Sequence, residues 1–184
     1  PAEGTETTAT TVSFTWTPSG DVLSGLNRYQ IQVSTISTFT TLKADSSTGL
    51  VANTTFALPA NDTYWWRVTA YDDAGNTRQV GDSTLVVDTI APTAFAFDTP
   101  AGTTRVQSPV TLKWYPTTES GAGFVSYTVT YDSDPAFGSP DSTATVSTIS
   151  DTDLASVSLA SDTWYWRVVA TDGSAEQIAN AVAA

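Results

Sequence analysis

The sequence contains an internal repeat, and this repeat constrains the fold more than any other feature. Two segments of the 184-residue chain align without a gap at an offset of 98 positions. The matched pairs are Trp16 with Trp114, Pro18 with Pro116, Tyr29 with Tyr127 and Phe39 with Phe137. A second match, at an offset of 100 positions, relates the run DTYWWRV at 62–68 to the run DTWYWRV at 162–168. Matched aromatic residues in one register over such a length indicate two homologous domains.

The boundary between the two domains is predicted near residue 90, which gives domains at 1–90 and 91–184. A short segment, Thr89 to Pro92, separates the last strand expected in the first domain from the first strand expected in the second. Because this linker holds a proline and the apolar Ile90, we expect it to be stiff. We therefore expect the two domains to be arranged end to end with little freedom.

Apolar residues alternate with polar residues along the matched segments, and this is the period of a β-strand. Val12, Phe14 and Trp16 alternate with threonine and serine, and the same pattern returns at 110–114. Turn-forming residues separate such stretches, for example at 18–21. The sequence predicts an all-β chain that folds as two tandem antiparallel β-sandwiches, in which each sheet buries one face.

These motifs resemble those of fibronectin type III-like modules, the Ig-like β-sandwiches of bacterial and archaeal surface or secreted proteins. The resemblance rests on second-strand tryptophans, third-strand tyrosines, a leucine before the sixth strand and an aromatic-x-Trp-Arg run within it: Trp16, Trp114, Tyr29, Tyr127, Leu58, Leu159, 64–67 and 164–167. It covers nearly the whole chain. It is specific for fold and not for function, because such modules serve as spacers, adhesion units and filament subunits alike.

The two domains differ at their starts. The segment from Ala94 to Phe97 is interpreted as a first strand of the second domain, whereas the first domain opens at Pro1 without a matching strand. We expect that the chain is a piece of a longer array. The alternative is that another chain supplies the missing sheet edge. At the other end, only about Ile178 to Ala184 remains for a last strand.

Composition and charge exclude several classes of function. With 19 acidic against 7 basic residues, the formal net charge of −12 would repel phosphate backbones, so nucleic-acid binding is not expected. No apolar stretch reaches the length of a membrane span, so membrane insertion is not expected either. Since the chain has neither histidine nor cysteine, Ser-His-Asp and Cys-His catalysis and imidazole or thiolate metal sites are excluded. We predict no enzymatic activity, no catalytic residue and no cofactor site.

Two groups of polar residues are candidates for bound calcium or attached glycans. The aspartates of two predicted turns, Asp72, Asp73, Asp132 and Asp134, carry the oxygen ligands that calcium takes, but not at EF-hand spacing. We favour solvated turn residues, so no metal is predicted and calcium stays the alternative. Asn53 and Asn61 each begin an N-x-[ST] sequence and are possible glycosylation sites, although such matches arise easily in a threonine-rich chain.

The aromatic run at 62–72 divides into two faces if it forms a strand. Alternation places Trp66 on the same face as the other apolar residues, so Trp66 and its equivalent Trp166 are predicted to be core. The opposite face carries the possible partner or ligand residues, which are Trp65, Arg67, Tyr165 and Arg167. Arginine beside an outward aromatic can also stack on it or cover the sheet, and we favour this packing role.

The sequence therefore predicts a non-catalytic, extracellular or cell-surface structural or adhesion module that acts as a stiff spacer in a long protein. Its expected partners are neighbouring domains of the same chain or identical subunits, and possibly a surface glycan. One alternative is a subunit of an extracellular filament or surface layer that strand exchange completes. The other is a carbohydrate-binding or accessory module of a secreted hydrolase.

Overall fold

A computed structural model describes residues 1–180, which form fourteen β-strands and no helix. The chain divides into two compact units, Pro1–Thr89 (unit 1) and Ile90–Ala184 (unit 2). None of the described residues forms a helix with the length and apolar character needed to cross a bilayer. The predicted last strand was expected to continue to Ala184, and its end lies outside the described residues.

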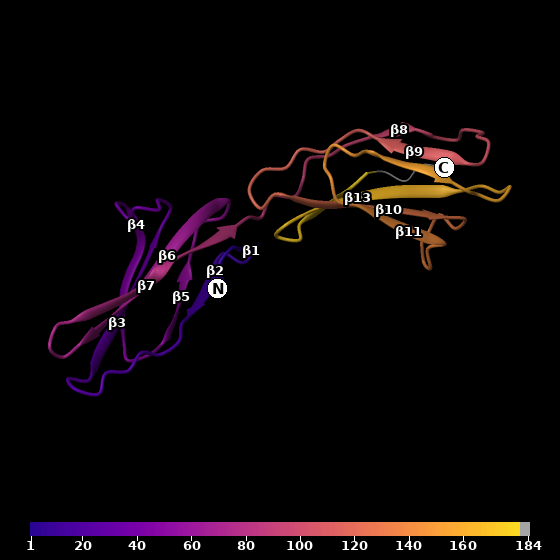
Figure 1. The fold of residues 1–184 in the computed structure, drawn as a ribbon. Helices are drawn as coiled ribbons and strands as arrows, with labels where there is room; N and C mark the ends of the chain where they lie inside the picture. The colour runs from indigo at the N-terminus through magenta and orange to yellow at the C-terminus, as the bar shows by residue number, and fades with distance from the viewer. Residues whose placement is uncertain (181–184) are drawn as a thin grey trace. The chain divides into compact units, whose positions relative to one another are not determined.

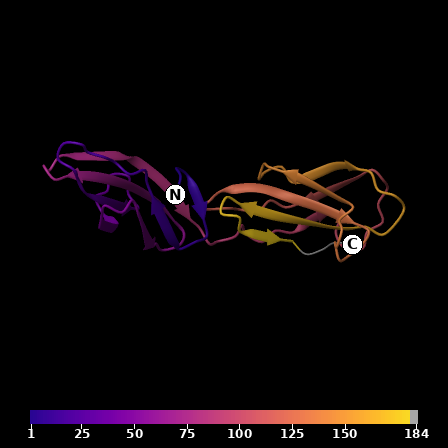
Figure 2. The same ribbon diagram turned by 90° about the horizontal axis from the view of Figure 1, so that it is seen from below.

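Unit 1 consists of a five-stranded and a two-stranded sheet (Figure 1; Figure 2 gives the view from below). The larger sheet has the order β1 (Thr5–Thr7), β7 (Thr77–Val87), β6 (Asp62–Asp72), β3 (Leu26–Ser34) and β4 (Leu42–Gly49). The smaller sheet pairs β2 (Thr11–Thr15) with β5 (Asn53–Ala57). All pairings are antiparallel except that of β1 with β7, which is parallel.

Unit 2 consists of a four-stranded and a three-stranded sheet, and all of its pairings are antiparallel. The larger sheet has the order β11 (Ser142–Val146), β10 (Phe124–Asp132), β13 (Tyr165–Asp172) and β14 (Gln177–Ala179). The smaller sheet has the order β12 (Asp153–Val157), β9 (Val110–Trp114) and β8 (Phe97–Thr99). The predicted fold class, an all-β chain with β-sandwich architecture, is confirmed.

Each unit has its own core, built by the alternation that the sequence displays. Along β6, every second residue from Tyr64 to Ala70 is buried, and the residues between them are half-buried. Trp66 is 7% exposed and Trp166 is 3% exposed, which confirms that both are core residues. Tyr29 and Tyr127 are fully buried at equivalent places in the two cores. Burial of such aromatic surface is the main favourable contribution to folding in a chain without disulfides.

The corner before the aromatic strand is built alike in the two units from different residues. In unit 1 the buried Tyr64 hydroxyl donates a hydrogen bond to the carbonyl oxygen of Pro59 (2.7 Å). In unit 2 the indole Nε1 of Trp164 donates to the carbonyl of Ala160 (3.1 Å). The side chain of Trp164 is half-buried, although the sequence alternation places it on the core face. A tyrosine that fixes this corner is a recurrent feature of Ig-like sandwiches.

The first strands of the two units lie on different sheets. In unit 2, β8 pairs with β9, and it begins at Phe97 and not at Ala94 as predicted. The residues before β8 form no strand. Their path is set by the loop after β9, since the N–H of Thr93 donates to the carbonyl of Thr118 in that loop (3.0 Å). In unit 1, no strand among residues 1–89 lies along the corresponding edge of β2, and the first strand, β1, joins the larger sheet instead.

The core tryptophans of the two units have different aromatic neighbours, and β8 supplies one of them only in unit 2. In unit 2 the ring of Phe97 packs on Trp166, with centroids 4.2 Å apart. In unit 1 the ring of Phe14 packs on Trp66 (5.3 Å) and also contacts Phe56 (5.7 Å). In the smaller sheet of unit 2, Leu112 takes the place of Phe14. Val157, which pairs with Val110 as Phe56 pairs with Val12, takes the place of Phe56. The core of unit 1 is therefore closed at this edge by its own side chains.

Candidate functional site

The predicted ligand face of the aromatic strands is occupied by packing within each unit. The guanidinium of Arg67 stacks over the ring of Phe39 (4.1 Å), and its Nε donates to Oε1 of Gln32 (2.9 Å). Arg167 stacks over Phe137 in the same way (4.5 Å). Both phenylalanines are buried, and both lie in the left-handed backbone region, with φ of 54° and 51°. The two arginines thus cover a loop phenylalanine that is repeated in the two units.

The two aromatic members of the predicted face lie in the middle of their sheets. Trp65 is half-buried and pairs with Ser34 on one side and Thr84 on the other. Tyr165 is half-buried and pairs with Asp132. Neither aromatic ring lies on the surface as a fully exposed platform.

The predicted calcium residues of unit 1 receive hydrogen bonds from donors in the same unit. Asp72 accepts from the backbone N–H and the side-chain amide of Asn76 (both 2.7 Å) and from the hydroxyl of Ser24 (3.1 Å). The hydrogen bonds from Asn76, with a smaller contribution from Ser24, hold the pKa of Asp72 below its ordinary value. Asp73 accepts from the side-chain amide of Asn27 (2.6 Å). Donors from the same turn and from the start of β3 and the segment before it therefore stabilise these negative charges.

The predicted calcium residues of unit 2 form a turn after β10. Oδ1 of Asp132 accepts from the N–H of Asp134 (2.8 Å), and Oδ1 of Asp134 accepts from the N–H of Ala136 (2.9 Å). Asp132 is buried, and its Oδ2 receives no hydrogen bond. Hydrogen bonds from aspartate to the backbone two residues on are typical of turns.

The two predicted glycosylation residues differ in their surroundings. Asn53 is exposed at the start of β5. Asn61 is exposed with a φ of 63°, and its side-chain oxygen accepts from the N–H (2.9 Å) and the hydroxyl (3.2 Å) of Thr89. The side chain of Asn61 thus fixes the last residue of unit 1.

The N-terminal segment of unit 1 is held against the end of β7 by a continuous row of contacts, the β1–β7 seam. The paired residues are Thr5 with Leu85, Glu6 with Val86 and Thr7 with Val87. Beyond the pairs, the N–H of Gly4 donates to the carbonyl of Thr84 (3.0 Å), and the N–H of Asp88 donates to the carbonyl of Thr7 (2.9 Å). Gly4 has a φ of 71°, a conformation that glycine adopts without strain.

A side-chain clasp reinforces one end of this seam. The carboxylate of Glu3 accepts two hydrogen bonds from Thr84, one from the backbone N–H (2.8 Å) and one from the hydroxyl (2.7 Å). These bonds, from the hydroxyl first and then from the N–H, hold the pKa of Glu3 below its ordinary value of 4.5. We call this pair of bonds the Glu3–Thr84 clasp. The sequence analysis missed it because the two residues are 81 positions apart.

Unit 2 contains a cavity of about 650 Å³ near the corner that Trp164 forms. Its wall includes aromatic side chains and one residue of each charge: Tyr131, Trp164, Tyr165, Trp166, Arg105 and Asp162. The rings of Tyr131 and Trp164 lie edge to face, with centroids 6.2 Å apart. Binding sites for small molecules combine apolar rings with a few polar groups in this way. Tyr165 is the one predicted ligand residue that borders the cavity.

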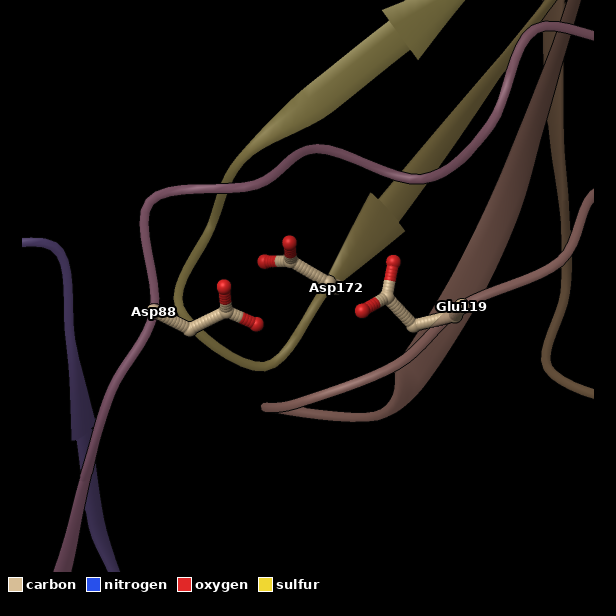
Figure 3. Close-up of side chains that lie close together, drawn as sticks. All are labelled: Asp88, Glu119 and Asp172. Atoms are coloured by element: carbon tan, nitrogen blue, oxygen red, sulfur yellow. The ribbon is translucent and has the colours of Figure 1, made fainter. Parts of the chain in front are cut away.

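A pair of carboxylates lies together in unit 2 at a place where the sequence analysis predicted no site. Glu119 lies between β9 and β10, and Asp172 ends β13; their carboxylate oxygens are within 4.8 Å of one another (Figure 3). Figure 3 also labels Asp88, which belongs to unit 1. Asp172 is 2% exposed, and its Oδ2 receives no hydrogen bond. This pair could not be recognised from the sequence because its members are distant in the chain, one in a loop and one at the end of a strand.

Comparison with known proteins identifies the fold. No family model and no curated protein matches the sequence. Among solved structures, the fibronectin(III)-like modules of Clostridium thermocellum CbhA match 98% of this chain and 88% of their own, with a TM-score of 0.57 and 11% identity.

In two further matches, this chain spans a smaller part of the matched structure. The FN1–FN3 domains of chicken CNTN1 match 99% of this chain, which spans 60% of theirs, with a TM-score of 0.48 and 14% identity. A Streptomyces avermitilis alpha-L-rhamnosidase complexed with L-rhamnose matches 97% of this chain, which spans 23% of that structure, with a TM-score of 0.38 and 12% identity. At 11% identity the likeness to the CbhA modules concerns the fold alone. The chain has the fibronectin type III-like fold that its motifs predict.

Proposed function

We propose that this chain is a non-catalytic, load-bearing spacer of an extracellular protein. The observation that carries the proposal is the parallel β1–β7 seam, which joins the first and the last strand of unit 1. Its expected partners are neighbouring modules of the same protein or identical subunits. The absence of histidine and cysteine from the sequence supports a role without imidazole or thiol catalysis.

The geometry of the seam determines how unit 1 would respond to tension. Because β1 and β7 run parallel, a force on Pro1 and a force on the residues after Val87 act at opposite ends of the paired segment. The hydrogen bonds of the seam are then loaded together in shear. Strands that are pulled from the same end separate one bond at a time, and this needs less force. The parallel arrangement, which is loaded in shear, therefore raises the force that a spacer can withstand without a larger core.

The test is mechanical unfolding of the full chain held by its two ends. Replacing Glu3 by alanine removes both bonds of the Glu3–Thr84 clasp, so we expect a lower unfolding force for the event that belongs to unit 1. The matched control is Glu6→Ala, which removes the same charged group from an exposed position on β1 and leaves the clasp intact. If Glu3→Ala and Glu6→Ala unfold at the same force as the wild type, the seam is not the load-bearing element.

The same experiment predicts a pH dependence. A carboxyl whose pKa is lowered in the folded state stabilises the fold above its unfolded pKa, and this contribution is lost as the pH falls through the folded pKa. For Glu3 the contribution is complete above about pH 4.5 and disappears below it. The force difference between wild type and Glu3→Ala should therefore shrink as the pH is lowered from 7 to below 4. A difference that stays constant over this range would contradict the assigned role of the carboxylate.

The aromatic cavity of unit 2 favours a second candidate function, carbohydrate binding. Sugar rings pack on aromatic faces, and the wall of the cavity combines Trp164 and Tyr131 with Arg105 and Asp162. We expect a binding module to lose polysaccharide in a pull-down when Trp164 is replaced by alanine and to retain it in Trp164→Phe, which keeps an aromatic face. Absence of binding to a panel of soluble and insoluble polysaccharides would exclude this candidate.

A further inference from the structure

Asp172 in unit 2 has a carboxylate oxygen that its own surroundings leave unsatisfied. Its Oδ1 accepts two hydrogen bonds, from the hydroxyl of Ser174 (2.9 Å) and from the N–H of Glu176 (2.9 Å). Its Oδ2 is buried and receives none. A buried anionic oxygen without a donor is costly, because desolvation is not offset by any favourable contact. The carboxylate of Glu119 lies within 4.8 Å, which adds a second negative charge beside the first.

The repeat shows how unit 1 satisfies the equivalent group. Asp72 corresponds to Asp172, and Asp21 corresponds to Glu119. In unit 1 the hydroxyl of Ser24 bridges the two carboxylates, at 2.5 Å from Oδ2 of Asp21 and 3.1 Å from Oδ2 of Asp72. The side-chain amide of Asn76 donates to the same Oδ2 of Asp72 (2.7 Å). The amide of Asn76 and the hydroxyl of Ser24 therefore both lie within hydrogen-bonding distance of Oδ2 of Asp72.

Both of these donors are replaced in unit 2. Ala122 stands at the place of Ser24, and Glu176 stands at the place of Asn76. Alanine has no side-chain donor, and an ionised glutamate only accepts hydrogen bonds. The backbone of the two loops is otherwise alike: the N–H of Asp73 donates to the carbonyl of Gly25 (3.1 Å), and the N–H of Gly173 donates to the carbonyl of Gly123 (2.9 Å). The two carboxylates are kept at this place, while the donors that unit 1 uses to hold them together are gone.

We propose that Glu119 and Asp172 bind a hard divalent cation of the calcium class. Calcium binds carboxylate oxygens at about 2.3–2.6 Å, so two oxygens within 4.8 Å of one another can share one ion. The cation takes the role that the donors Ser24 and Asn76 have in unit 1 and is the positively charged partner of Oδ2 of Asp172. The remaining ligands of the ion are carbonyl oxygens or water. With two carboxylates, affinity in the range of about 10⁻⁴–10⁻³ M is expected, as in other extracellular modules.

The test measures calcium binding to the full chain after treatment with a chelator. Titration calorimetry with calcium chloride should give a dissociation constant in the stated range for the wild type, and calcium should raise the temperature of an unfolding transition. Asp172→Asn should weaken binding at least tenfold. The matched control Asp72→Asn, which changes the equivalent residue of unit 1, should leave calcium binding unchanged.

A second variant keeps the test decisive if Asp172→Asn fails to fold. Glu176→Asn places at the position of Asn76 an amide that can donate to Oδ2 of Asp172, so this variant should be more stable without calcium and should bind calcium more weakly. The proposal is overturned if the wild type shows neither heat nor a thermal shift at 10 mM calcium. It is also overturned if Asp72→Asn abolishes binding as fully as Asp172→Asn. A pair held together by a shared proton would give stability that depends on pH and not on calcium. None of these outcomes depends on the response of unit 1 to force.

Discussion

Replacing Trp114 by alanine should lower the unfolding free energy of unit 2 by about 3–5 kcal/mol. The side chain is 2% exposed and packs edge to face on the fully buried Tyr127, with ring centroids 5.3 Å apart. Truncation removes the apolar burial of one of the two tryptophans in this core and leaves a cavity that the surrounding strands cannot fill. Calorimetry of the full chain should show one transition moved down by more than about 10 °C.

The neighbouring aromatic residue provides the control for this prediction. Tyr115 follows Trp114 in the chain, points to the opposite side and is 56% exposed. Tyr115→Ala should change the unfolding free energy by no more than about 0.5 kcal/mol. Equal losses in the two variants would contradict the assignment of inner and outer positions along this segment.

Replacing Phe14 by alanine should destabilise unit 1 by a similar amount, about 3–5 kcal/mol. Phe14 is fully buried on β2, an edge strand of the smaller sheet, and contacts both Phe56 and Trp66. The large effect is expected because no strand of unit 1 lies over this edge to close the cavity. Urea denaturation followed by tryptophan fluorescence measures the loss.

The matched control for Phe14 is the next residue along the strand. Ser13 is exposed on the outer side of β2, and Ser13→Ala should cost no more than about 0.5 kcal/mol. A small effect of Phe14→Ala would mean that the core of unit 1 is not closed at this edge by its own side chains. The proposal that another chain completes the sheet would then gain support.

Much of the fold could be predicted from the sequence because the repeat and the strand period agree. Trp66 and Trp166 could be assigned to the core since alternation and the matched run in the second domain place them on the same face. The role of Arg67 could be narrowed to packing or partner binding, but its contact with Phe39 could not be predicted. That contact depends on a loop phenylalanine with positive φ, which no local pattern indicates.

The β1–β7 seam and the pair of Glu119 and Asp172 could not be predicted, because the residues that form each of them are far apart in the sequence. β1 has the sequence Thr-Glu-Thr, which lacks apolar alternation, and its partner lies about eighty residues away. The pair brings together Glu119 of a loop and Asp172 at the end of β13, and the burial of Asp172 follows from tertiary packing. The repeat alignment contains one indication of this pair: alanine stands in place of Ser24 in the second repeat, whereas both acidic positions stay acidic.

The most direct test of the load-bearing role is to change the direction of the applied force. The chain has no cysteine, so pairs of introduced cysteines give unambiguous attachment points. In Ala2→Cys with Thr89→Cys, the force acts at opposite ends of the β1–β7 seam. In Ala2→Cys with Gly81→Cys, it acts at the same end, and Gly81 is exposed with open space around it. The account predicts a clearly higher unfolding force for the first pair. Equal forces, or a higher force for the second pair, would contradict it.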